Sequence, residues 1–142
     1  MNGNSALVDV TIKNNNFSQG VSSSGNFYGT PIYIAAGSSV WNLKIEDNRI
    51  QYERTSTTVG GGIVSDGTFY NTVIRNNTFT SSRVYSSSGS AYGIYVTAAS
   101  AVSPDSIEIK GNRFDLALDG SVNSGAIVYN LAANQTLTRL FI

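Results

Sequence analysis

The chain has 142 residues, no net charge, and neither histidine nor cysteine. These absences exclude the usual zinc sites, thiol nucleophiles, disulfide bonds and Ser-His-Asp triads. The basic residues are scattered and leave no basic surface for nucleic acid, and no apolar run approaches the roughly 20 residues of a membrane-spanning helix. We therefore expect neither nucleic acid nor a membrane as a partner.

One pattern recurs four times, with an asparagine about every 30 residues. It reads apolar-x-Ile-charged-x-Asn-x-Phe, with Thr at the first position of the third copy and Ile at the last position of the second. Strand alternation points the central isoleucines inward, and the final Phe or Ile continues the inner stack after a corner. The four copies are Val10–Phe17, Leu43–Ile50, Thr72–Phe79 and Ile107–Phe114.

A second, weaker motif follows each copy of the first. Each period therefore holds two strand-like runs separated by segments rich in Gly, Ser, Asn and Thr, and no helical periodicity is present. Ser/Thr-rich stretches at 22–24, 55–58 and 86–88 keep the same phase, which indicates aligned loops. The second-motif runs are Pro31–Ile34, Gly62–Ser65, Gly93–Val96 and Ala126–Tyr129.

Short strands in a period of about 30 residues predict a solenoid, in which equivalent strands stack about 4.8 Å apart. The repeated asparagines fall at the corner of the first motif, where asparagine tolerates the left-handed backbone of a tight turn. Each amide can also bond the equivalent amide of the next repeat and so satisfy buried polar groups. We predict a ladder of Asn15, Asn48, Asn77 and Asn112.

These Ile-x-Ile-x-x-Asn-x-Phe repeats resemble the pectate-lyase-like superfamily, and among its members the phage tailspikes most of all. The resemblance spans essentially the whole chain and implies an all-β fold, a right-handed parallel β-helix without significant helix. It implies one domain, 1–142, with coils at about 8–39, 40–70, 71–104 and 105–136 and a partial coil at 137–142. Because no cap is visible, we expect a fragment of a longer chain; the alternative is a short domain protected by oligomerisation.

Outward positions of the first motif form a column in which the charges largely alternate. The sequence predicts a salt-bridge ladder there, on a solvated face. The alternative is a groove for an acidic sugar, in which Lys44, Arg75 and Lys110 meet carboxylates. The column consists of Lys13, Glu46, Arg75 and Lys110.

Catalytic candidates are few. The resemblance to pectate lyases implies Ca²⁺ held by clustered aspartates, but this chain has no matching cluster, and we expect neither a metal nor a cofactor. Glycoside hydrolysis needs two carboxylates about 5–10 Å apart. Asp66 and Glu53 are the weak candidates, and the alternative for Asp66 is a turn residue that bonds its own backbone.

Tyrosines of the second motif form the best candidate for a binding surface. If the motif's isoleucines point inward, Tyr33, Val64, Tyr95 and Val128 form an exposed outward stripe. Tyrosine suits a saccharide, because its ring stacks on the pyranose while its hydroxyl forms a hydrogen bond. Asp66 and Thr97 lie in register beside the stripe, and we assign them to the same site. In the alternative interpretation the fourth copy reverses phase and part of the stripe is core.

Together these features predict a structural β-helix module that contacts a polysaccharide or cell-surface glycan. By resemblance to tailspikes, we expect a homotrimer located in a virion tail or outside the cell. The alternative function is polysaccharide degradation by a lyase or glycoside hydrolase of the same superfamily.

Overall fold

The computed structural model describes residues 6–19, 30–54, 60–84, 91–98, 105–116, 125–131 and 139–142. The serine- and threonine-rich stretches expected to form aligned loops lie outside these ranges. Within them the secondary structure is entirely β-strand, and every strand pair is parallel. None of the described segments forms a helix that could cross a membrane.

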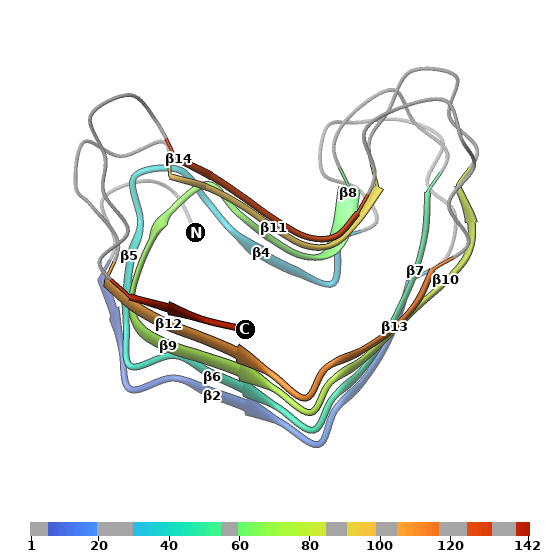
Figure 1. Cartoon of the computed structure of the whole chain (residues 1–142), viewed down its shortest axis with the longest axis horizontal. Coiled ribbons are helices and arrows are strands. Elements are labelled where there is room, and N and C mark those ends of the chain that lie inside the picture. The colour runs from blue at the N-terminus through green and yellow to red at the C-terminus, as the bar shows by residue number, and fades with distance from the viewer. Residues whose placement is uncertain are drawn as a thin grey trace.

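The strands form three sheets, which the chain visits in turn (Figure 1). The first sheet contains β1 (Ala6–Val8), β2 (Thr11–Lys13), β5 (Ser39–Trp41), β6 (Lys44–Glu46), β9 (Thr68–Arg75), β12 (Asp105–Lys110) and β15 (Leu140–Phe141). The second contains β3 (Asn16–Gln19), β7 (Arg49–Arg54), β10 (Thr78–Val84) and β13 (Arg113–Leu116). The third contains β4 (Ile32–Ile34), β8 (Gly60–Ser65), β11 (Ala91–Ala98) and β14 (Gly125–Leu131).

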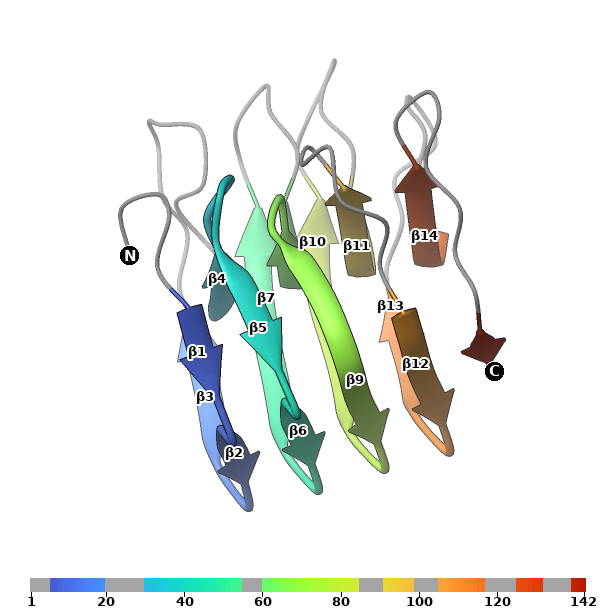
Figure 2. The ribbon, with the colours of Figure 1, turned by 90° about the vertical axis from the view of Figure 1, so that its left-hand side faces the viewer.

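Strands from successive repeats lie side by side within each sheet, as Figure 2 shows for the first sheet. The curled, all-parallel arrangement is compatible with the predicted solenoid. It also shows that each first motif contains two strands, because the asparagine corner divides it between the first and second sheets. A strand upstream of that motif, such as β5, was not predicted: its apolar stretch is too short to give a clear alternation.

The core is built from side chains stacked in register. Ile45 pairs with Ile12 on one side and with Ile74 on the other, and Ile74 pairs with Ile109. Ile45 and Ile74 are completely buried, which confirms the predicted inner stack. Because equivalent side chains meet at the strand spacing, each layer of the core packs on a nearly identical layer.

A second inner stack continues beyond the corner. The pairs there are Phe17 with Ile50, Ile50 with Phe79, and Phe79 with Phe114. The rings of Phe79 and Phe114 are stacked, with centroids 4.8 Å apart. Gly93 lies close to this stack, since a Cβ there would come within 2.4 Å of the Phe114 ring. The absence of a side chain thus lets β11 approach the aromatic core.

One expectation about the corner was wrong. The left-handed residue is not the repeated asparagine but the residue before it, and the φ values are 57° at Asn14, 55° at Asp47, 56° at Asn76 and 63° at Gly111. The physical reason is a division of roles: the left-handed residue turns the chain, and the next residue can then direct its amide inward. Gly111 completes the set because glycine adopts positive φ without strain.

Candidate functional site

The outer face of the third sheet carries the predicted stripe. Val64 pairs with Tyr33 on one side and Tyr95 on the other, and Tyr95 pairs with Val128. The fourth strand keeps the same phase, because Ile127 pairs with the fully buried Ile94. The alternative in which the fourth copy reverses phase is therefore wrong.

The stripe is less exposed than the sequence suggested. Tyr33 is 36% exposed and Tyr95 is half-buried, whereas Val64 is completely buried. The expectation of an exposed Val64 was wrong because it lies between two strands that carry tyrosines at the equivalent position, and large rings shield a small neighbour at strand spacing. Tyr92 adds a further ring, stacked on Tyr95 with centroids 4.5 Å apart.

Asp66 joins this stripe through side-chain hydrogen bonds. The Tyr33 hydroxyl donates to Asp66 Oδ2 over 2.9 Å, and the Thr97 hydroxyl donates to Oδ1 over 2.6 Å. The backbone N–H of Asp66 also donates to the carbonyl of Ile34. The carboxylate thus links side chains contributed by two other repeats. The alternative predicted from the sequence was a turn residue whose side chain bonds its own backbone.

The environment raises the pKa of two tyrosine hydroxyls on this face. Burial, followed by the hydrogen bond to Asp66 and its negative charge, raises the pKa of Tyr33 to about 12. Burial is also the main cause that raises the pKa of Tyr95, with further contributions from Tyr92 and Asp66, while a hydrogen bond with Asn130 acts in the opposite direction. The neutral hydroxyl of Tyr33 is the form that donates to the Asp66 carboxylate.

The arrangement offers little support for catalysis by Asp66. The other candidate, Glu53, belongs to β7 of the second sheet, and its side chain lies outside the described part of the structure. Asp66 follows β8 of the third sheet and already accepts two hydrogen bonds. In the described ranges no three acidic residues gather closely enough to hold a metal ion.

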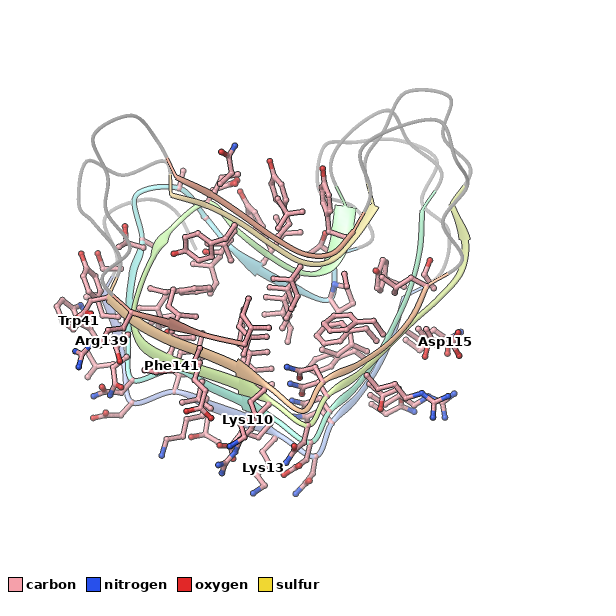
Figure 3. The ribbon with its side chains drawn as sticks, in the orientation of Figure 1. Lys13, Trp41, Lys110, Asp115, Arg139 and Phe141 are labelled. Carbon is pink, nitrogen blue, oxygen red and sulfur yellow. The ribbon has the colours of Figure 1, made fainter. Side chains whose placement is uncertain are left out.

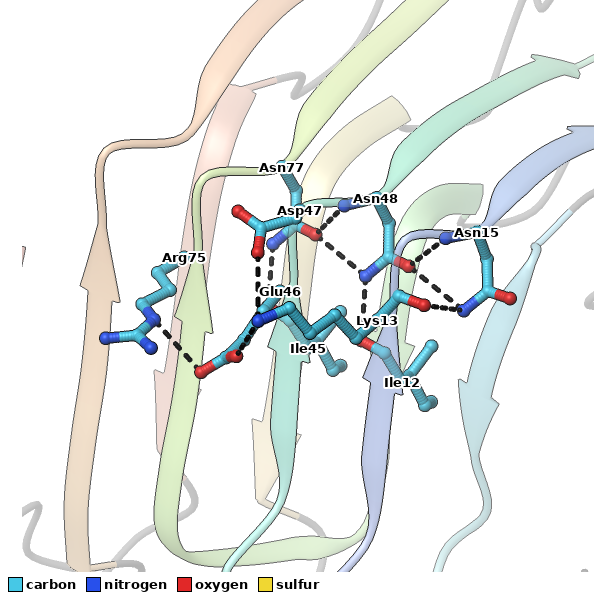
Figure 4. A network of polar contacts seen from close by, with 9 residues as sticks. All are labelled: Ile12, Lys13, Asn15, Ile45, Glu46, Asp47, Asn48, Arg75 and Asn77. Atoms are coloured by element: carbon cyan, nitrogen blue, oxygen red, sulfur yellow. Dashed lines mark hydrogen bonds and ion pairs between the residues drawn. The ribbon is translucent and has the colours of Figure 1, made fainter.

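The repeated asparagines have a structural role inside the corner (Figure 4). The Asn48 amide accepts from the backbone N–H of Asn15 over 2.9 Å, and the Asn77 amide accepts from the N–H of Asn48 over 3.0 Å. Nδ2 of Asn48 donates to the Ile12 carbonyl, and Nδ2 of Asn77 donates to the Ile45 carbonyl. Both amides are almost completely buried, so these contacts satisfy polar groups that water cannot reach.

Asn112 extends the same series. Its Oδ1 accepts from the backbone N–H of Asn77 over 2.9 Å and from Asn77 Nδ2 over 3.0 Å. Its own Nδ2 donates to the Ile74 carbonyl over 2.8 Å. The four asparagines are thus joined by hydrogen bonds and serve the corner rather than a binding surface.

The charged column of the first sheet forms ion pairs around one acid. Glu46 lies between Arg75, at 2.9 Å, and Lys13, at 3.6 Å, and its side chain is only 7% exposed. Lys13 also approaches Asp47 at 3.4 Å. These pairs confirm the predicted salt bridges for this part of the column, and they engage Arg75, which the acidic-sugar alternative required. Lys110 forms no ion pair within the described residues.

The structure also contains an outer polar ladder that was not predicted. Asn42 Nδ2 donates to Asp9 over 2.8 Å, and Asn71 Nδ2 donates to Asn42 over 2.7 Å. All three residues have positive φ, as does Ser106 in the next repeat. The signal was present in the sequence, because an Asp, Asn or Ser precedes every ladder asparagine by the same interval. Because Asp, Asn and Ser are common throughout this chain, their recurrence at this position does not stand out from the sequence alone.

Comparison of the chain with protein-family models, with curated proteins and with solved structures found no significant match.

Proposed function

We propose that the chain is a right-handed parallel β-helix module that contacts a polysaccharide through the outer face of its third sheet. The cluster of Tyr33, Asp66 and Thr97, beside the stacked rings of Tyr92 and Tyr95, carries this proposal. Aromatic rings next to fixed hydrogen-bonding groups are the combination that recognises a pyranose.

The repeat pattern, the parallel sheets and the in-register stacks support the β-helix assignment, and the tailspike resemblance supports the role. We propose a module of a phage tailspike or tail fibre, or of a similar surface adhesin, that acts as a homotrimer in a virion tail or outside the cell. The two donors on Asp66 favour binding over cleavage, because they hold its carboxylate as an acceptor.

The test compares variants of the aromatic stripe. Tyr95→Ala should weaken polysaccharide binding by about 1–3 kcal/mol, by analogy with aromatic stacking on other flat ligands. Tyr95→Phe is the matched control: it keeps the ring and should retain most of the affinity. A melting curve for Tyr95→Ala comes first, and a drop of more than about ten degrees would mean that the ring is mainly core.

Asp66→Asn separates binding from catalysis. The substitution removes one acceptor oxygen, so binding should weaken only modestly, and a reducing-end assay should detect no cleavage by either protein. Measurable cleavage by the wild type that disappears in Asp66→Asn would replace this proposal with a polysaccharide-degrading enzyme.

A further inference from the structure

A second surface, on the outer face of the first sheet, combines a groove with ordered polar side chains. An open groove of about 330 Å³ lies there, lined by Asp9, Thr11, Asn42, Lys44 and Asn71. This volume is at the lower end of the range for small-molecule sites, about 300–1,000 Å³. The groove lies on a different sheet from Tyr33, Asp66 and Tyr95 and shares no residue with that site.

The amides of the groove are held in fixed positions. Asn71 donates to Asn42, and Asn42 donates to the Asp9 carboxylate, so the three side chains form one directed chain of hydrogen bonds. Their left-handed backbones, with φ of 49°, 56° and 57°, set the same orientation in three successive repeats. A ligand would therefore meet acceptors and donors that are already ordered, which lowers the entropic cost of binding.

Lys44 brings a cation into the groove without a partner from the neighbouring strands. Its neighbours in register are Thr11 and Val73, neither of which is acidic, and it forms no ion pair within the described residues. The charged column two residues further along differs, because Glu46 there is enclosed by two cations. With one ammonium and one carboxylate, the groove has no net charge and offers both strong donors and strong acceptors.

An aromatic pair adjoins two of the groove residues along the chain. Trp41 and Tyr70 directly precede Asn42 and Asn71, and their rings are stacked with centroids 3.9 Å apart. Trp41 is 44% exposed, and Figure 3 shows it on the outside of the ribbon. Exposed aromatic surface next to ordered amides can cover the apolar part of a sugar while the amides meet its hydroxyl groups.

We propose that this groove binds an uncharged saccharide unit. Sugar hydroxyl groups donate and accept at once, which matches a groove that presents Lys44 as a donor, the Asp9 carboxylate as an acceptor and amides between them. An acidic sugar would place its carboxylate near Asp9 as well as near Lys44. The inference rests on the proposed polysaccharide-binding function and adds a second contact face to it.

Trp41 makes the test direct, because it is the only tryptophan of the chain. Its fluorescence should change on titration with neutral oligosaccharides, and we choose hexamers of glucose, galactose, mannose and N-acetylglucosamine, with hexagalacturonate as the acidic comparison. At least one neutral hexamer should bind with an affinity that added salt barely alters, since the groove has no net charge to screen.

Two variants locate the binding. Asn42→Gly removes the amide but keeps the positive φ, and Lys44→Gln removes the charge; each should weaken binding of the neutral hexamer by about tenfold. Asn16→Gly is the matched control at an exposed asparagine outside the groove and should bind as the wild type does. Melting curves of the groove variants close to the wild type would show that the loss is local.

Tyr95→Ala distinguishes this site from the one on the third sheet. The Trp41 fluorescence titration of this variant should match that of the wild type. Calorimetry also detects binding at the third sheet, and there the variant should show weaker binding. The groove proposal is overturned if no neutral hexamer changes the fluorescence, if hexagalacturonate alone binds, or if Asn42→Gly and Lys44→Gln bind as the wild type does. In each of these cases, the proposed function would still be supported if calorimetry detected saccharide binding by the wild type and weaker binding by Tyr95→Ala.

Discussion

At the scale of single residues, asparagine serves two purposes in this chain. Asn48 and Asn77 adopt an ordinary backbone and direct their amides into the buried corner, where they bond backbone groups of neighbouring repeats. Asn42 and Asn71 adopt positive φ and direct their amides to the surface. The first pair stabilises the fold, and the second pair remains accessible to a ligand.

The buried ladder should be sensitive to truncation. Asn77→Ala removes the acceptor of the Asn48 N–H and the side-chain donor to the Ile45 carbonyl, and we expect a loss of about 1–3 kcal/mol in the free energy of unfolding. Asn16→Ala, at an exposed position of β3, should cost less than about 0.5 kcal/mol. Urea denaturation measures both, and equal losses would contradict the structural role of the ladder.

Tyr33 predicts a pH dependence at alkaline pH. Its pKa is about 12 in the folded protein and about 10 when unfolded, so ionisation favours the unfolded chain as pH rises. The stabilisation from its neutral hydroxyl is complete below about pH 10 and is lost between about pH 10 and 12.

Tyr33→Phe isolates this contribution, since burial also raises the pKa of Tyr52 and of Tyr129. The stability advantage of the wild type over Tyr33→Phe should shrink as pH rises from about 9 to about 11.5. Urea denaturation at several pH values measures the difference. A constant difference would show that the Tyr33 hydroxyl has the same pKa in both states.

At the scale of elements, the parallel strands convert a sequence period into columns of side chains. The column that contains Glu46 is the clearest case, because three neighbouring strands place one acid between two cations. The carboxylate is almost buried, so its partners matter more than those of an exposed ion pair.

Removal of Arg75 should therefore cost more than removal of a neighbouring cation. Arg75→Ala leaves the buried Glu46 carboxylate with Lys13 alone, and we expect a loss on the order of 1–2 kcal/mol. Lys110→Ala is the matched control in the same column and should change stability by less than about 0.5 kcal/mol.

Glu46→Gln combined with Arg75→Ala tests the cause. Removing the buried charge should restore part of the stability that Arg75→Ala loses, because the cost arises from a carboxylate with too few partners. Thermal denaturation of the single and double variants measures the coupling. Additive effects would mean that Arg75 stabilises the sheet by packing alone.

At the scale of the whole molecule, several large apolar side chains lie on the outside of the sheets. Val8 of β1 and Phe141 of β15 are each more than half exposed, and neither belongs to the two proposed saccharide surfaces. Exposed apolar surface of this kind is often covered by a partner, and side-by-side association of identical chains would cover several such side chains at once.

We therefore expect the chain to self-associate. Light scattering at micromolar concentration should give a mass of about 45 kDa for a trimer, against 15.1 kDa for one chain. A mass close to that of one chain at this concentration would contradict the trimer.

The sequence alone determined which residues stack on one another. A repeat of about 30 residues brings equivalent positions into register, so the inner stacks through Ile45 and Ile50 and the outward column through Glu46 followed directly from the spacing. These are contacts along the direction in which the repeats stack, and one period is sufficient to predict them.

The tertiary structure decided the contacts that the period does not specify. It brought the Asp66 carboxylate between Tyr33 and Thr97, moved the left-handed residue of each corner to the position before the asparagine, and buried Val64 between two tyrosines. It also assembled the groove beside Asn42. The reason is geometric: the alternation of a strand tells which face a side chain occupies, whereas its rotamer, the turn of the backbone at a corner and the shielding by larger neighbours depend on distances that only the folded chain defines.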